Sequence, residues 1–182
     1  GNNPEKIDWG FDEDYTFFFF FETVKADPTL RNKVRNNSSI IRYVKYNGIR
    51  ILFAGDLETA GWEWLAKNNE FFKSLMKGGL DVLVAPHHGH DSGFPKALLD
   101  LTGNVKAIVL SKDSEATKEG TDVYTGYSNY ADGVRYYNTN DKNMYFGKVL
   151  TTRSNGNVYL FVDPQYGFYV ATETASPNHK KI

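Results

Sequence analysis

The sequence predicts an α/β fold with a mixed sheet and flanking helices. Three short apolar runs rich in β-branched residues have the character of buried strands, at residues 50–54, 80–85 and 105–110. Longer stretches with helical patterns lie between them, at residues 57–77 and 94–101. Alternation of strands and helices favours a sheet that is at least partly parallel, with helices packed on its faces.

The N-terminal part of the chain adds two strands to this plan. Residues 15–24 include five consecutive phenylalanines and predict a strand that is buried on both faces. Asn47-Gly48 separates apolar runs at residues 38–46 and 50–54, and this dipeptide is the strongest short signal for a hairpin. We expect the helix at residues 57–77 to break near Asn68 and Asn69.

The C-terminal part predicts a lid and a meander. Residues 111–147 are polar and rich in tyrosine, which favours a substrate-facing lid with a short helix near residues 129–137. Three strands then follow at residues 148–152, 157–162 and 166–172. We therefore expect a lead-in segment at residues 1–14, one domain at residues 15–172 and a flexible tail at residues 173–182.

Composition excludes several classes of protein. The net charge of −1 over 182 residues argues against a general electrostatic attraction for nucleic acid. The absence of cysteine excludes disulfides and thiolate metal sites. No apolar run approaches the ~20 residues that span a bilayer, so we expect no membrane segment in this chain.

Three of the four histidines lie directly after the apolar run at residues 80–84, within the sequence Ala-Pro-His-His-Gly-His-Asp. Ligands and metals collect where strands of an α/β sheet give way to loops. Neutral imidazole is the commonest metal ligand and also titrates near physiological pH. His87 and His88 are therefore the strongest functional candidates, and the alternative is a polar, hydrogen-bonded loop.

Asp56 ends a second strand, about thirty residues upstream, beside Gly55. Glycine allows a sharp turn or a close approach of the backbone to a ligand. A carboxylate and an imidazole at two neighbouring strand ends supply half of a site for zinc or manganese. The alternative is that Asp56 caps the helix that begins near Leu57, because aspartate is a favoured N-cap.

Residues 37–44, 51–56 and 81–89 together resemble the second half of a metallo-β-lactamase-fold hydrolase, and most of all its ComEC-type competence branch. The resemblance covers about residues 36–163, and its most specific motifs are Gly55-Asp56 and His87-His88-Gly89. It implies half of an αββα sandwich, with Asp56 as a metal-bridging carboxylate and His87 as the last metal-ligand histidine. His88 would orient the site or handle protons, and the family has serine where this chain has His90.

The same resemblance implies a ligand set that this chain does not complete. The family's first half carries an H-x-H-x-D-H motif, whereas this chain has no histidine before His87. The next expected histidine would fall just before Ser38, where Asn36 and Asn37 stand. Two ligands do not make a four-coordinate zinc site. We therefore expect zinc or manganese to bind this chain weakly or not at all, and the missing N-terminal half to be its partner.

Two function classes remain open. The first is a metal-dependent hydrolase of phosphodiesters or other esters, with nucleic acid as a substrate suggested by the ComEC likeness. In it Asp56 and His87 hold metal, and Asp56 and His88 act in catalysis. The second is a non-catalytic interaction or regulatory module on a degenerate form of the same half-fold. The chain is then either a fragment without its N-terminal half or a natural degenerate relative.

Overall fold

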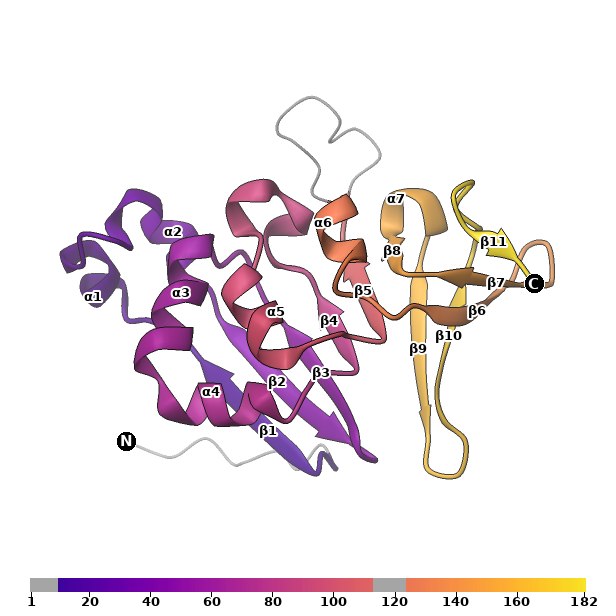
Figure 1. Cartoon of the computed structure of the whole chain (residues 1–182), viewed down its shortest axis with the longest axis horizontal. Coiled ribbons are helices and arrows are strands. Elements are labelled where there is room, and N and C mark those ends of the chain that lie inside the picture. Colours follow the sequence, from indigo (N-terminus) through magenta and orange to yellow (C-terminus); the bar gives the residue numbers. More distant parts are fainter. Residues whose placement is uncertain (1–9, 113–123) are drawn as a thin grey trace.

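The computed structural model describes residues 10–112 and 124–182, and these form an α/β arrangement of mixed sheets flanked by helices (Figure 1). The first sheet has the strand order β1-β2-β3-β4-β5-β8. Its strands are β1 (Glu13–Phe17), β2 (Ile41–Tyr46), β3 (Ile49–Phe53), β4 (Val82–Val84), β5 (Ala107–Leu110) and β8 (Val149–Thr151). The pairs from β1 to β3 are antiparallel, and those from β3 to β8 are parallel.

A second sheet is built entirely from the C-terminal part of the chain, in the order β11-β7-β6-β10-β9. Its strands are β6 (Val134–Asn138), β7 (Asn143–Gly147), β9 (Val158–Asp163), β10 (Gly167–Thr172) and β11 (Lys180–Lys181). The β6–β10 pair is parallel and the other pairs are antiparallel. The α/β class with mixed sheets and flanking helices, as expected from the sequence, is confirmed.

The helices cover one face of the first sheet and supply the larger core. They are α1 (Phe21–Ala26), α2 (Val34–Asn37), α3 (Thr59–Asn68), α4 (Glu70–Lys77), α5 (Lys96–Thr102) and α6 (Tyr124–Ser128), whereas α7 (Thr152–Asn155) directly follows β8 and contributes no residue to that core. Trp62 of α3 and Phe72 of α4 are fully buried in the same cluster as Leu52 and Leu83 of the sheet. The predicted break near Asn69 is confirmed, because α3 ends at Asn68 and the Asn69 side chain caps α4 by accepting from Phe72 N at 2.9 Å.

The second sheet packs against the other face of the first. Strand alternation sends Val44, Ile51 and Val82 away from the helices. These side chains form a second cluster with Leu160 and Phe168 of the second sheet. The described residues therefore form three layers, with helices first, the first sheet in the middle and the second sheet last. No helix among them is both long and apolar enough to cross a membrane.

The phenylalanine run does not form the doubly buried strand expected at residues 15–24. Strand β1 ends at Phe17, and the chain turns into α1 at Phe21. Strand β1 lies at the edge of the first sheet. The phenylalanines that follow it can therefore bury side chains on one side of the chain but not on both. Phe17 and Phe19 are buried, whereas Phe18 and Phe20 are exposed by 53% and 70%.

The C-terminal part also differs from expectation. The helix expected at residues 129–137 is wrong, since residues 134–138 form β6 and the short helix α6 comes earlier. The expected meander is wrong in one strand, because β8 joins the first sheet while β9 and β10 pair in the second. Residues 113–123, the centre of the expected lid, lie outside the described residues, as do residues 1–9 of the lead-in segment.

The final residues, expected as a flexible tail, are held on the second sheet. Strand β11 pairs with β7, and the ring of His179 lies between two hydrogen-bond partners. Its Nδ1 is 2.8 Å from the hydroxyl of Tyr136, and its Nε2 is 3.0 Å from the carbonyl oxygen of Val149. Burial of this ring lowers the pKa of His179. The histidine therefore has a structural role, and it lies in the second sheet, away from the edge that carries the other three.

A buried carboxylate ties three parallel strands together at the edge opposite to the histidines. Asp81, which is 3% exposed, precedes β4 and accepts from Arg50 N at 2.9 Å and from Arg50 Nε at 3.1 Å. Its second oxygen lies 2.9 Å from Lys106 Nζ. Burial raises the pKa of Asp81, but the hydrogen bonds from Lys106 and Arg50 outweigh it, so the pKa lies below its usual value.

We expect Asp81→Asn to lower the free energy of unfolding by about 1.5–3 kcal/mol at pH 7, the range for hydrogen bonds to charged groups. A depressed carboxylate pKa stabilises the fold above the unfolded pKa, and this stabilisation is lost as the pH falls through the folded pKa. The difference between wild type and variant in urea denaturation should therefore shrink between pH 5 and pH 3. A difference that stays constant over this range would contradict the assignment.

Candidate functional site

Parallel pairing brings three strand ends to one edge of the first sheet. Gly55 and Asp56 follow β3, Pro86 to Gly89 follow β4, and Ser111 follows β5. The backbone N–H of His87 donates to the carbonyl oxygen of Gly55 at 2.9 Å, which joins the first two loops. The site therefore lies at the carboxyl edge of the parallel strands, where open α/β sheets bind their ligands.

Gly55 allows the β3 loop to turn tightly against the preceding chain. Its φ is +56°, and a Cβ atom there would lie 2.8 Å from the carbonyl oxygen of Ile40. The next backbone N–H, that of Asp56, donates to Ser39 Oγ at 3.0 Å. Asp56 is thereby held at the edge with its carboxylate about half exposed.

The two adjacent histidines have an unusual backbone. His87 (φ 47°, ψ 43°) and His88 (φ 55°, ψ 21°) are both in the left-handed region, within the 3₁₀ segment Pro86–Gly89. Residues other than glycine rarely adopt this conformation, and each instance costs of order 1–3 kcal/mol. Strain of this kind persists where surrounding structure over-determines it, and it clusters at active sites and ligand clamps.

His88 and Asp56 face each other across the edge. The Nδ1 of His88 lies 2.7 Å from the carbonyl oxygen of Ser111. A carbonyl oxygen only accepts, so Nδ1 carries the proton and donates it. In the neutral ring this leaves a lone pair on Nε2, which is 3.7 Å from Asp56 Oδ1. A lone pair facing a carboxylate at this separation is favourable only with a proton or a cation between them.

His87 is paired with a different carboxylate. Its Nδ1 lies 3.3 Å from Oε1 of Glu58, a buried residue, and 3.2 Å from Ser92 Oγ. The same Glu58 oxygen accepts from Asn36 Nδ2 at 2.6 Å, and Glu58 N donates to Asn37 Oδ1 at 3.3 Å. The residues before Ser38 thus hold Glu58 in place, and Glu58 in turn faces the imidazole.

His90 interacts mainly with its own neighbours. Its Nδ1 lies 2.8 Å from Asp91 Oδ1 and 3.0 Å from Ser92 Oγ. The Ser92 hydroxyl therefore lies within hydrogen-bond distance of both His90 and His87. His90 is placed to orient the loop through Ser92.

The donor set fits part of a zinc or manganese site. Two donors on one zinc ion at ~2.0–2.2 Å in tetrahedral geometry lie about 3.4 Å apart, which is close to the 3.7 Å between His88 Nε2 and Asp56 Oδ1. Within residues 10–112 and 124–182, however, no three His, Asp or Glu side chains are grouped so that they would hold a metal ion. The described residues thus offer a pair of donors and no complete four-coordinate site.

The structure pairs the predicted site residues differently from the sequence prediction. Asp56 approaches His88, whereas His87 faces Glu58. The alternative reading of Asp56 as a helix cap is wrong, because α3 begins at Thr59 and its N-cap residue is Glu58, whose side chain makes no capping bond. Sequence reasoning missed Glu58, Asn36 and Ser92, since each is a common polar residue without a distinctive motif.

Comparison with known proteins adds no identification. No known protein family matches the chain, and no curated protein matches it. The functional interpretation therefore rests on the geometry of the strand edge that carries Asp56, Glu58, His87 and His88.

Proposed function

We propose that this chain contributes the Asp56–His88 pair and His87 to the metal centre of a hydrolase of the metallo-β-lactamase superfamily. The proposed reaction is hydrolysis of a phosphodiester or another ester. The remaining metal ligands would come from residues other than those described, which agrees with the absence of an H-x-H-x-D-H motif from this sequence.

The observation that carries the proposal is the 3.7 Å approach of His88 Nε2 to Asp56 Oδ1. Because the Ser111 carbonyl oxygen accepts from Nδ1, the neutral ring has its only lone pair on Nε2, the nitrogen that lies 3.7 Å from the carboxylate. Both side chains are open to solvent, at 63% and 49% exposure. A cation bound between them would account for the close approach of these two exposed groups.

The surroundings of His87 give independent support. Metal-bound imidazoles usually donate their other ring N–H to a carboxylate, which fixes the tautomer and the orientation of the ring. Oε1 of Glu58 lies in that position, 3.3 Å from Nδ1 of His87. The same oxygen accepts a hydrogen bond from Asn36 Nδ2. The arrangement leaves Nε2 of His87 as the nitrogen for a metal ion, with Glu58 as a positioning residue.

A metal ion bound here would supply the usual chemistry of such centres, a water molecule whose pKa is lowered toward neutrality. The roles of the chain's own residues follow from their contacts. Asp56, His87 and His88 would bind the metal, Glu58 and Ser92 would orient His87, and the Ser111 carbonyl would orient His88.

A second candidate is a non-catalytic interaction module on the same fold. It is favoured by the finding that the described residues bring only two donors together at the edge, Asp56 and His88. In this case the contact between His88 and Asp56 is a solvent-exposed polar pair of the kind that contributes little to stability.

Replacement of His88 by glycine tests the backbone strain at this position. Glycine adopts the left-handed conformation without strain. We therefore expect His88→Gly to change the free energy of unfolding by less than about 1 kcal/mol, because relief of strain offsets the lost bond to Ser111. Gly89→Ala is the matched control: its Cβ would lie 2.4 Å from Leu110 Cδ2, and overpacking costs about 1–3 kcal/mol. Urea denaturation measures both, and a strongly destabilised His88→Gly would contradict the strain argument.

Zinc titration by calorimetry tests the donor pair. We expect weak binding by the wild-type chain, loss of binding in Asp56→Asn and in His88→Gln, and unchanged binding in Asp141→Asn, which changes an exposed carboxylate in the turn between β6 and β7. Since metal binding displaces protons from its ligands, the affinity should rise with pH. Tight binding of zinc that survives Asp56→Asn would place the metal elsewhere and overturn the assignment.

Hydrolysis tests the reaction itself. The protein encoded by the complete open reading frame is assayed with zinc or manganese on bis(p-nitrophenyl) phosphate, on a carboxylic ester and on single-stranded DNA. Asp56→Asn should abolish turnover, and Glu58→Gln should lower it about 10–100-fold through weaker metal binding. Asp141→Asn, in the turn between β6 and β7 of the second sheet, serves as the control. A wild type that is inactive on every ester would favour the interaction module.

A further inference from the structure

The outer face of the second sheet carries a row of exposed aromatic side chains. Residues of β9 and β10 alternate, so that Leu160, Phe168 and Val170 point toward the first sheet. Their neighbours point outward, and Tyr159, Phe161 and Tyr169 are exposed by 41%, 44% and 53%. Exposed aromatic groups gathered on one face usually mark a binding surface.

These rings are stacked in parallel and do not interlock. The rings of Phe161 and Tyr169, which are register partners, have centroids 5.0 Å apart and an interplanar angle of 14°. Tyr159 continues the row, with its centroid 6.4 Å from that of Phe161 and an angle of 28°. We refer to these three side chains as the aromatic platform. Two χ angles per ring keep such a platform ordered at low entropic cost.

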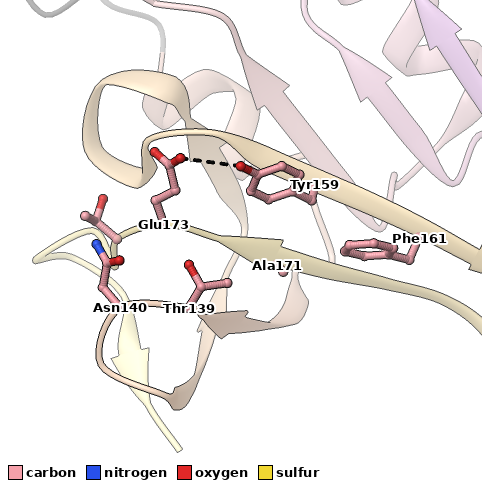
Figure 2. A pocket seen from close by; sticks show the side chains of 7 residues that line it. Thr139, Asn140, Tyr159, Phe161, Ala171 and Glu173 are labelled. Carbon is pink, nitrogen blue, oxygen red and sulfur yellow. Dashed lines mark hydrogen bonds between the residues drawn. The ribbon is translucent and has the colours of Figure 1, made fainter.

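A cleft of about 480 Å³ opens at one end of the platform. Ala171 lies opposite Tyr159 of β9 and Tyr137 of β6, and its small side chain is part of the lining of the cleft. Figure 2 shows Tyr159 and Phe161 on one wall of the cleft and Glu173, Asn140 and Thr139 around it.

The cleft presents both acceptors and donors beside the aromatic rings. The Glu173 carboxylate is held by Asn157, through Nδ2 at 2.8 Å and the backbone N–H at 3.1 Å, and by the hydroxyl of Tyr159 at 3.4 Å. These bonds lower the pKa of Glu173, with the one from the Asn157 backbone first among them. The exposed Asn140, which also lines the cleft, adds an amide that both donates and accepts.

We propose that the platform and its cleft bind an uncharged glycan built of pyranose sugars. The apolar C–H face of a pyranose packs on flat aromatic rings, and its hydroxyl groups pair with carboxylate and amide side chains at the edge. The site offers this combination, with Tyr159, Phe161 and Tyr169 as the platform and Glu173 and Asn140 as hydroxyl partners. The cleft of about 480 Å³, with Ala171 in its lining, lies at the end of the row.

Charge favours a sugar over a nucleic acid. Stacked rings also bind bases, but such sites combine the rings with a positively charged groove for the backbone. Here the charged group at the cleft is the Glu173 carboxylate, which would repel phosphate. The site is also separate from the candidate metal centre, since its residues belong to the second sheet and those of the centre lie at the edge of the first.

Binding of defined hexasaccharides tests the proposal. The wild-type chain is titrated by calorimetry with cellohexaose, maltohexaose and chitohexaose, and amide shifts are followed by NMR. We expect binding of at least one of them, with Phe161→Ala and Tyr159→Ala weakening it about tenfold or more. Glu173→Gln should weaken it less, since the amide retains hydrogen bonding. Tyr166→Ala is the matched control, because this tyrosine is 76% exposed but lies in the turn beyond the platform.

Three outcomes would overturn the proposal. Absence of binding to all three hexasaccharides would remove the glycan assignment. Salt-sensitive binding of a dT oligonucleotide that depends on Arg135, an exposed cation of β6, would make the face a nucleic-acid site. A concentration-dependent dimer abolished by Phe161→Ala would show that a second copy of the chain covers the platform. Circular dichroism of each variant separates loss of binding from loss of fold.

Discussion

Parallel pairing of β3, β4 and β5 is the constraint on which the rest of this structure depends. It places the loops after these strands at one edge, where Asp56, His87, His88 and the Ser111 carbonyl meet. At the opposite edge the same pairing brings Arg50, Asp81 and Lys106 together. The two edges therefore have different tasks, since the buried Asp81 carboxylate holds strands together at one edge, whereas the side chains of Asp56 and His88 stay open to solvent at the other.

Much of the arrangement around this edge follows from local sequence. Asn47-Gly48 gives the β2–β3 hairpin, Asn69 gives the break between α3 and α4, and the apolar runs give β3, β4 and β5. Each of these signals acts over a few residues and faces little competition from distant parts of the chain. The strand-end position of Asp56 and of the histidines could be predicted for the same reason.

Other features depend on contacts between distant segments and were missed. The phenylalanine run reads as a buried strand, but the edge position of β1 leaves Phe18 and Phe20 without a second layer to pack on. The partner of each histidine was not predictable either. The left-handed backbone at His87 and His88 turns His88 toward Asp56 and leaves His87 to Glu58, and no spacing rule in the sequence encodes that turn.

The path of the chain between the two sheets affects how the molecule unfolds. The chain builds β6 and β7 in the second sheet, leaves it for β8 in the first, and returns for β9 and β10. Neither sheet is then a contiguous piece of sequence, and a cut at any point between β6 and β10 removes strands from at least one of them. We expect the two sheets to melt as one cooperative unit, so that heat or denaturant would disrupt the aromatic platform and the histidine edge together.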